Sequence, residues 1–454
     1  VQLALPDGYG IKGFRRDSLP VIPKNFELIP RQVKTDKGYK ADAAAVKQIK
    51  VITKLWNESD GIIVATDCAR EGELIFRLVY EKAGCQKPVK RLWISSLEES
   101  AIHEGFRALR DGRDYDNLYR AALCRAQADW LVGINATRLF SLLYGTTLNV
   151  GRVMSPTLAL IVQREAEIAF FQSEPFYTVQ MSCSLLATTP RMKEKADAER
   201  IAQQCNLKTA VVKNIDKKRK TEKPPALYDL TSLQREANRL FGYTAQQTLD
   251  YAQSLYEKKL ASYPRTDSRY LTSHMENSTR MLVEQTVKVL PLMKKEMFSR
   301  NVAQVIDNSK VTDHHALIPT AGIAEYDLLS LPAGERSLLT LLMVRLLCAV
   351  GKPCRIHETA VTLECEGVSF SVKWKQIMDM GWKAMEKNYR TALKFTPVEE
   401  TAVRELLPLN DQMTFLPVKA FVQEGKTSPP KSYTDVICYE RGDKKSPIER
   451  RIDP

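Results

Sequence analysis

Three carboxylates that follow one short apolar run are the first residues whose types and spacing could do chemistry. Asp67, Glu71 and Glu73 occur in "ATDCAREGELI", directly after "GIIV". Carboxylates near a strand end could hold Mg²⁺, which takes few protein ligands and keeps several waters. Arg70 beside them could reach a phosphate, whereas Ala69 supplies no oxygen ligand. The alternative is an acid-rich helix start that the helix macrodipole stabilises.

A second candidate is a tyrosine in the segment "KLASYPRTDSRYLTS". Pro264 prevents a helix from continuing, so we expect Tyr263, Arg265 and Asp267 on a short irregular connection between two helices. A guanidinium beside a phenol can favour the phenolate and bind a phosphate in bidentate fashion. In-line attack on phosphorus then depends mainly on positioning and charge stabilisation. The alternative is a surface turn in which Arg265 and Asp267 form a solvated ion pair.

Two histidines and two basic segments complete the candidates. His314 and His315 are adjacent and point in different directions, so we do not expect joint metal ligation. One of them could contact a phosphate, and the alternative is a structural histidine. Arg152 precedes a predicted helix N-terminus, which is a natural phosphate-binding position. Arg125 and Asp129 lie one turn apart and form either an ion pair within the helix or part of a groove that contacts DNA bases.

The overall charge of the chain favours a polyanionic partner. The 454 residues carry a formal charge of +13, which points most simply to nucleic acid. A generally basic protein is the alternative. The nine cysteines include no CxxC pair, which argues against a zinc ribbon or a disulfide framework and for a reducing compartment. No apolar run reaches membrane-spanning length. No secretion signal is evident, and we expect residue 1 not to be the natural start.

The elements that would position the acidic segment alternate between helix and strand. The apolar spacing predicts five of them: a helix over 42–56, a strand over 61–66, a helix from 72 to 84, a strand over 89–96 and a helix over 97–110. Ser96 and Glu99 would form a capping box for the last helix. This alternation predicts a small α/β domain with a parallel sheet. Ligands of such sheets lie at the carboxyl ends of the strands, where Asp67 falls.

The elements around the tyrosine are mainly helical. The pattern from 115 to 172 is helical throughout, and Ser155 is expected to be the N-cap of a helix there. A helical insert over about 226–350 should follow a basic linker at 216–225. Within it we expect two helix caps, formed by Thr244 with Gln247 and by Ser273 with Glu276.

Two β regions flank this insert. Alternating polar and apolar residues predict a strand over 177–185 and a hairpin over 359–374 that turns at Glu366 and Gly367. A helical domain held on two stretches of chain can swing on a hinge.

Taken together, these segments resemble type IA DNA topoisomerases, most closely the topoisomerase III branch. The resemblance extends from about residue 1 to about residue 434. It is carried, in the family's order and spacing, by "ATDCAREGELIF", "RLWISSLEESAI", "ADWLVGINATRLFS", "VGRVMSPTLALIVQRE", "PPALYDLTSLQREANRLFGYTAQQTLDYAQSLYE", "YPRTDSRYL" and "DHHALIPT". Each motif is a weak signal by itself, whereas the ordered series is strong.

The resemblance assigns roles to the candidate residues. Tyr263 would be the nucleophile that forms a 5′-phosphotyrosyl bond to single-stranded DNA, and Arg265 would stabilise the attacked phosphate. Asp267 and His314 would lie close to the reacting groups. The residues that match the acidic group of the family's Toprim metal site, and so imply Mg²⁺, are Asp67, Glu71 and Glu73. The residues in segments that line its single-strand groove are Arg125, Asp129, Arg152 and Thr157.

The implied fold class is α/β plus α+β multidomain, with a toroidal core. The expected parts are a partial Toprim domain (1–114), the first part of a split helical domain (115–172), the first part of a β arch (173–225), the helical insert with the tyrosine (226–325), the second part of the arch (326–392) and the remainder of the split domain with a divergent tail (393–454). The implied activity is strand passage that relaxes negative supercoils and decatenates DNA without ATP. We expect a cytoplasmic, nucleoid-associated monomer with a helicase as a candidate partner and no membrane contact.

The sequence departs from the family pattern mainly on the metal side. The family's Glu-Lys-Pro-Ser type stretch has no counterpart, and Ala69 stands where a second Asp is usual. Met154 replaces a glutamine, and the last twenty residues do not continue into the expected segment. The alternative function is therefore a catalytically impaired homologue that only binds single-stranded DNA. A tyrosine recombinase is a third class, against which the acidic segment and the mid-chain tyrosine argue.

Overall fold

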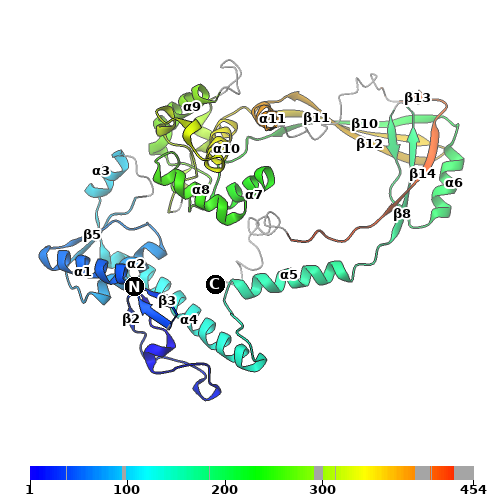
Figure 1. Ribbon diagram of the computed structural model, residues 1–454. Helices are drawn as coiled ribbons and strands as arrows, with labels where there is room; N and C mark the ends of the chain where they lie inside the picture. The colour runs from blue at the N-terminus through cyan, green and yellow to red at the C-terminus, as the bar shows by residue number, and fades with distance from the viewer. Residues whose placement is uncertain are drawn as a thin grey trace.

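The computed structural model describes residues 1–36, 38–94, 99–183, 185–290, 300–311, 313–393, 410 and 412–433. The chain passes from an N-terminal α/β part along two long helices to a β region, and returns to a helical part that lies above the N-terminal part in the view of Figure 1. No helix in these described ranges is long and apolar enough to cross a membrane.

The N-terminal part contains the predicted alternation of helices and strands. Its described elements are β1 (Gln2–Leu3), β2 (Leu28–Ile29), β3 (Gln32–Thr35), β4 (Gly38–Ala41), α1 (Ala43–Glu58), β5 (Ile62–Val64), α2 (Arg70–Lys82), β6 (Val89–Arg91), α3 (Glu99–Arg107) and β7 (Arg110–Asp111). Strands β5 and β6 are parallel, as predicted, and β7 adds an antiparallel edge. Ile62, Val64 and Phe76 form the core between sheet and helices. The predicted cap residue Ser96 lies outside the described residues.

Two helices follow, and residues 145–153 between them are not helical, although the pattern over 115–172 is helical throughout. Helix α4 (Asp116–Tyr144) ends where Gly145 takes a left-handed conformation with φ of 66°. Helix α5 (Met154–Ala169) begins one residue before Ser155, so the predicted N-cap is also wrong. The hydroxyl of Ser155 instead accepts a hydrogen bond from the Gly151 amide at 3.2 Å.

The described residues of the β region form one seven-stranded antiparallel sheet. Its members are β8 (Pro175–Ser182), β9 (Leu186–Thr188), β10 (Ala210–Glu222), β11 (Cys354–Cys365), β12 (Val368–Asp379), β13 (Thr414–Phe415) and β14 (Lys419–Lys426), in the order β13-β10-β11-β12-β9-β8-β14. The hairpin turn at Glu366 and Gly367 is confirmed, with φ of 49° and 79°. The linker expected over 216–225 is wrong as far as Glu222, because β10 stays paired with β11 up to that residue. Helix α6 (Lys195–Cys205) packs on β8 and β14.

The helical part carries the largest hydrophobic core. It contains α7 (Leu230–Phe241), α8 (Ala245–Glu257), α9 (Glu276–Val289), α10 (Ala333–Ala349) and α11 (Lys383–Ala392). The capping box of Thr244 and Gln247 at the start of α8 is confirmed. The cap predicted at Ser273 is wrong, because a 3₁₀ turn over Ser273–Met275 leads into α9 and puts Met275 at the N-cap position.

Candidate active site around Tyr263

The segment that carries Tyr263 is irregular, as predicted from Pro264, and it is fixed by hydrogen bonds to two neighbouring segments. The Ser262 amide donates to the Ile318 carbonyl at 2.9 Å. The hydroxyl of Thr266 donates to the His314 carbonyl at 3.0 Å, and the Thr266 carbonyl accepts from the Leu230 amide at the start of α7. The tyrosine is therefore held between the first turn of α7 and the histidine segment.

The two adjacent histidines have different surroundings. The ring of His314 lies 4.5 Å from the ring of Tyr263, between centroids, and Tyr256 meets Tyr263 edge-on at 5.4 Å. The Nδ1 of His315 lies 2.8 Å from the Ala316 carbonyl, and burial lowers the pKa of this half-buried side chain. His314 is therefore the histidine that lies beside the tyrosine, a choice that the sequence left open.

The acidic segment of the N-terminal part reaches this same place. Asp67 Oδ1 lies 3.7 Å from His314 Nε2. A second contact between the two parts joins Glu104 of α3 to His274, with Oε2 and Nε2 3.8 Å apart. The N-terminal part therefore contacts the helical part at two places, and one of them is the loop after β5 beside the tyrosine site.

The charges around Tyr263 hold its side chain in the neutral form. Burial raises the pKa of the phenol, the negative charge of Asp67 raises it further, and Arg265 lowers it. Because desolvation and an anion both disfavour phenolate, the proton must leave as the oxygen attacks. The charge of Arg265 acts in the opposite direction and favours the phenolate.

A further carboxyl group shares this environment. Burial and the charge of Asp267 raise the pKa of Asp313, and Asp67 adds a smaller effect in the same direction. His314 and Arg70 act in the opposite direction. Both Arg70 and Asp267 therefore lie close enough to influence the site. Asp313 was not singled out from the sequence, although its place directly before the histidine pair was a usable signal.

The three acidic candidates differ in exposure and contacts. The side chains of Asp67 and Glu71 are 52% and 66% exposed. Glu73 is buried, with Oε1 2.9 Å from Arg77 Nε and Oε2 3.2 Å from Arg91 Nε. A buried carboxylate neutralised by two guanidinium groups contributes to the local fold rather than offering an open ligand position.

The described residues do not by themselves fit a metal site. Among them, no three acidic, histidine or cysteine side chains are grouped to hold an ion. Ala69 is the N-cap of α2 and supplies no side-chain hydrogen bond to its first turn. Arg91, which was not predicted, donates to the Asp67 carbonyl at 2.6 Å and so holds the backbone of this segment. A charged residue within a buried strand is the signal that could have found it.

Of the four residues expected in a DNA groove, three form contacts between elements and Thr157 bonds within its own helix. Asp129 of α4 pairs with Arg152, Oδ1 to Nε at 2.5 Å, rather than with the residue one turn before it. Arg125 lies 4.0 Å from Glu71, between Nη1 and Oε1, and so approaches the acidic segment. Thr157 on α5 is exposed and donates to the Val153 carbonyl at 2.8 Å.

Comparison with known proteins places the chain in a family. The family model described as DNA topoisomerase matches residues 113–436. The chain belongs to the type IA DNA topoisomerase family. Type IA DNA topoisomerases are isomerases.

Two relatives show the extent of the match. The chain is 37% identical over 452 residues to DNA topoisomerase 3 of Bacillus subtilis, covering 96% of this chain and 60% of that protein. It is 35% identical to DNA topoisomerase 3 of Shouchella clausii, covering 95% of this chain and 59% of the relative. The chain thus spans about 60% of the length of these relatives.

A solved structure shows the same kind of fold. Full-length topoisomerase I from Thermotoga maritima superposes with a TM-score of 0.68 at 22% identity, covering 89% of this chain and 67% of that one. The mixed α/β multidomain fold is therefore shared with a bacterial topoisomerase I.

Proposed function

We propose that this type IA family member cleaves single-stranded DNA with Tyr263 as the nucleophile. The observation that carries the proposal is the meeting of Tyr263, His314 and Asp67, which come from three separate segments. The phenol oxygen would form a bond to phosphorus while the bond from phosphorus to the 3′ oxygen breaks. The phenol loses its proton and the 3′ oxygen gains one, which leaves a 5′-phosphotyrosyl bond that the strand hydroxyl can reverse without ATP.

The neighbouring side chains would bind and orient the phosphate. Arg265, whose charge already favours the phenolate, would contact the phosphate oxygens in bidentate fashion. His314, whose ring lies beside that of Tyr263, would donate a hydrogen bond to the phosphate. Asp267 and Asp67 would place negative charge beside the reacting groups. Cations that accompany the DNA phosphates would offset this charge.

The larger assembly follows from the resemblance and is also part of the proposal. We assign a partial Toprim domain to 1–114, which would form a toroidal core together with the other domains, and the insert over 226–325 would lift away to pass a strand. The activity would relax negative supercoils and decatenate DNA, in a cytoplasmic monomer that can cooperate with a helicase. The residues proposed to contact the single strand are Arg70, Arg125, Asp129, Arg152 and Thr157.

Mg²⁺ dependence remains a prediction from the family. The two exposed carboxylates, Asp67 and Glu71, are the side chains that could contribute to an ion, and Glu73 is committed to Arg77 and Arg91. This commitment favours one alternative, a homologue that binds single-stranded DNA without completing the reaction. Such a protein would show binding that weakens steeply with salt and no cleavage.

A covalent-trapping assay separates the two functions. The chain is incubated with labelled single-stranded oligonucleotides and denatured, and label that stays with the protein is measured. We expect an adduct with wild type and none with Tyr263→Phe. Tyr256→Phe is the matched control, because it removes the hydroxyl of the neighbouring ring and leaves the nucleophile intact. Salt-sensitive binding without any adduct would contradict the cleavage proposal and support the alternative.

A further inference from the structure

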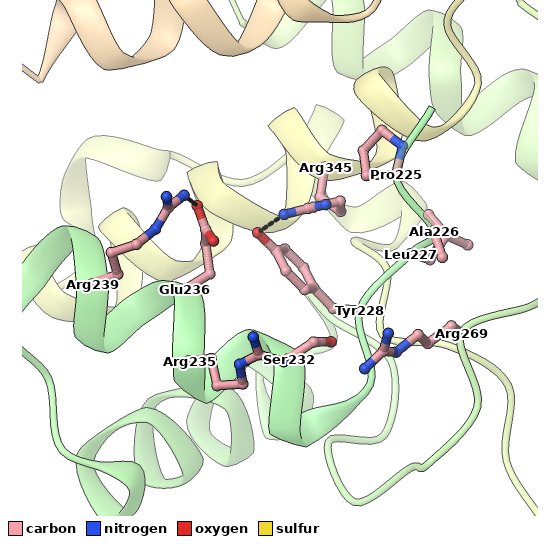
Figure 2. Close-up of a pocket in the computed structure, with 10 residues that line it drawn as sticks. All are labelled: Pro225, Ala226, Leu227, Tyr228, Ser232, Arg235, Glu236, Arg239, Arg269 and Arg345. Atoms are coloured by element: carbon pink, nitrogen blue, oxygen red, sulfur yellow. Dashed lines mark hydrogen bonds and ion pairs between the residues drawn. The ribbon is translucent and has the colours of Figure 1, made fainter. Parts of the chain in front are cut away.

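A pocket lined by four arginines lies in the helical part, on a side that the proposed chemistry does not use. Its volume is about 360 Å³, and Arg235, Arg239, Arg269 and Arg345 converge on it around Tyr228. Figure 2 shows that these arginines come from α7, from α10 and from the segment that follows Tyr263. This volume lies in the range of small-molecule sites.

The charge of the pocket lining is strongly unbalanced. Besides the four arginines, the lining contains one acidic side chain, Glu236, which pairs with Arg239. Arg345 donates to the hydroxyl of Tyr228 at 2.8 Å and stacks on its ring at 4.2 Å. A guanidinium has five N–H donors, so this bond uses one of them. Glu236 and Asp229 each pair with one of the four arginines, so these six residues keep a net positive charge that an anion bound between them would offset.

Arg345 is unusual in its sequence context, which strengthens this interpretation. It is the single charged residue within "LLTLLMVRLLCAV", and the apolar residues of α10 are buried in the core. A charge in such a helix is retained at a desolvation cost unless a partner compensates it. The guanidinium group of Arg345 lines the pocket beside Tyr228, where a ligand could bind.

The pocket shares a wall with the nucleophile segment. Arg269 lies on that segment and pairs with Asp229 at 2.7 Å between Nε and Oδ2. Asp229 is the N-cap of α7, where its side chain and that of Ser232 form a capping box. The other wall includes Pro225, on the connection from β10 to α7. A ligand here would therefore contact the helices that support Tyr263 without touching the tyrosine itself.

We propose that this pocket is a phosphate-binding site. Phosphate is the anion that several guanidinium groups recognise best, through paired hydrogen bonds to its oxygens. The phosphate could belong to a DNA backbone or to a free polyphosphate, because both present the same oxygens. The proposal rests on the charge and shape of the pocket and goes beyond the cleavage reaction proposed for Tyr263.

Binding of inorganic pyrophosphate provides the first test. Its dissociation constant is measured by calorimetry at constant ionic strength with wild type, Arg239→Gln and Arg280→Gln. Both arginines form an ion pair with a glutamate of their own helix, Glu236 and Glu276, but only Arg239 lines the pocket. The side chains of Arg239 and Arg280 are 47% and 60% exposed, so neither substitution disturbs the core. We expect Arg239→Gln to weaken binding by about tenfold, the effect of losing a charge-assisted hydrogen bond, and Arg280→Gln to leave it unchanged.

A second arm identifies the source of the phosphate. The affinity for a single-stranded oligonucleotide is measured in a Tyr263→Phe background, so that cleavage plays no part. If Arg239→Gln weakens oligonucleotide binding and Arg280→Gln does not, the phosphate belongs to a DNA backbone. If Arg239→Gln weakens only pyrophosphate binding, the phosphate belongs to a free polyphosphate. If Arg239→Gln binds both probes as Arg280→Gln does, the proposal is wrong. That result would leave the covalent-trapping outcome at Tyr263 unaffected.

Discussion

Substitution of Gly72 by alanine tests whether the first turn of α2 positions Asp67. Gly72 is buried, and a Cβ atom built on it would lie 2.1 Å from the Asp67 carbonyl oxygen and 2.8 Å from the Asp67 nitrogen. Real Cβ atoms essentially never come closer than 3.0 Å to such atoms. Because the obstacle is backbone rather than a flexible side chain, the loop or the helix must move.

The size of the effect follows from that overlap. Increasing the separation from 2.1 to 3.0 Å requires a shift of about 0.9 Å, which would displace Asp67 relative to His314. Overpacking of this kind costs about 1–3 kcal/mol, and the removal of a helical glycine offsets about 0.5–1 kcal/mol of it. A misplacement of about 1 Å in an active site can reduce the rate by about a hundredfold. We therefore expect lower stability and much slower cleavage.

The assay combines urea denaturation with single-turnover cleavage of a labelled oligonucleotide. Gly133→Ala is the control for the loss of a helical glycine, because its Cβ would lie 3.7 Å from the nearest atom, the Val150 oxygen. That variant should be as stable as wild type or slightly more stable. A Gly72→Ala protein that unfolds and cleaves like wild type would refute the close approach and the positioning of Asp67 derived from it.

Three other perturbations act on the same region. Arg91→Leu should lower the free energy of unfolding by about 3–5 kcal/mol, because it removes one partner of the buried Glu73 carboxylate; a urea midpoint equal to that of wild type would contradict this. Asp67→Asn should lower the pKa of Tyr263, because it removes an anion that disfavours phenolate; the difference absorbance titration against Tyr263→Phe measures it, and an unchanged value would count against the contact. Burial lowers the pKa of His315, so the unfolded state binds the extra proton in mild acid. The stability that this histidine contributes is complete above its unfolded pKa of about 6.5 and is lost as the pH falls below it, so His315→Gln should lose less stability than wild type between pH 7 and pH 5 in urea titrations.

Local features of the fold were predictable where one residue type has a strong conformational preference. The capping box at Thr244 and the turn at Glu366 and Gly367 were predicted from such preferences and are confirmed. The prediction at Ser155 was wrong because its hydroxyl bonds to the Gly151 amide within the preceding turn. The break after α4 depends on Gly145, whose left-handed conformation ends the helix although apolar residues continue beyond it.

The candidate site was predictable as a set of residues, and its geometry was not. The types and spacing of residues around Tyr263 indicated phosphate chemistry, but the approach of Asp67 to His314 depends on how two distant parts of the chain pack. The choice between the two histidines likewise depends on which ring packs against Tyr263. Glu73 could not be separated from the exposed carboxylates by pattern, since its burial depends on Arg91 from the neighbouring strand.

The most direct test of the central claim is to locate the covalent link. The denatured adduct is digested with trypsin and nuclease, and the modified peptide and its attached nucleotide are identified by mass spectrometry. We predict that the nucleotide is attached through its 5′ phosphate to Tyr263 in the tryptic peptide 260–265, and that the adduct from intact oligonucleotide retains a 3′ label and not a 5′ label. A link to another residue, a retained 5′ label or the absence of any adduct would contradict the account.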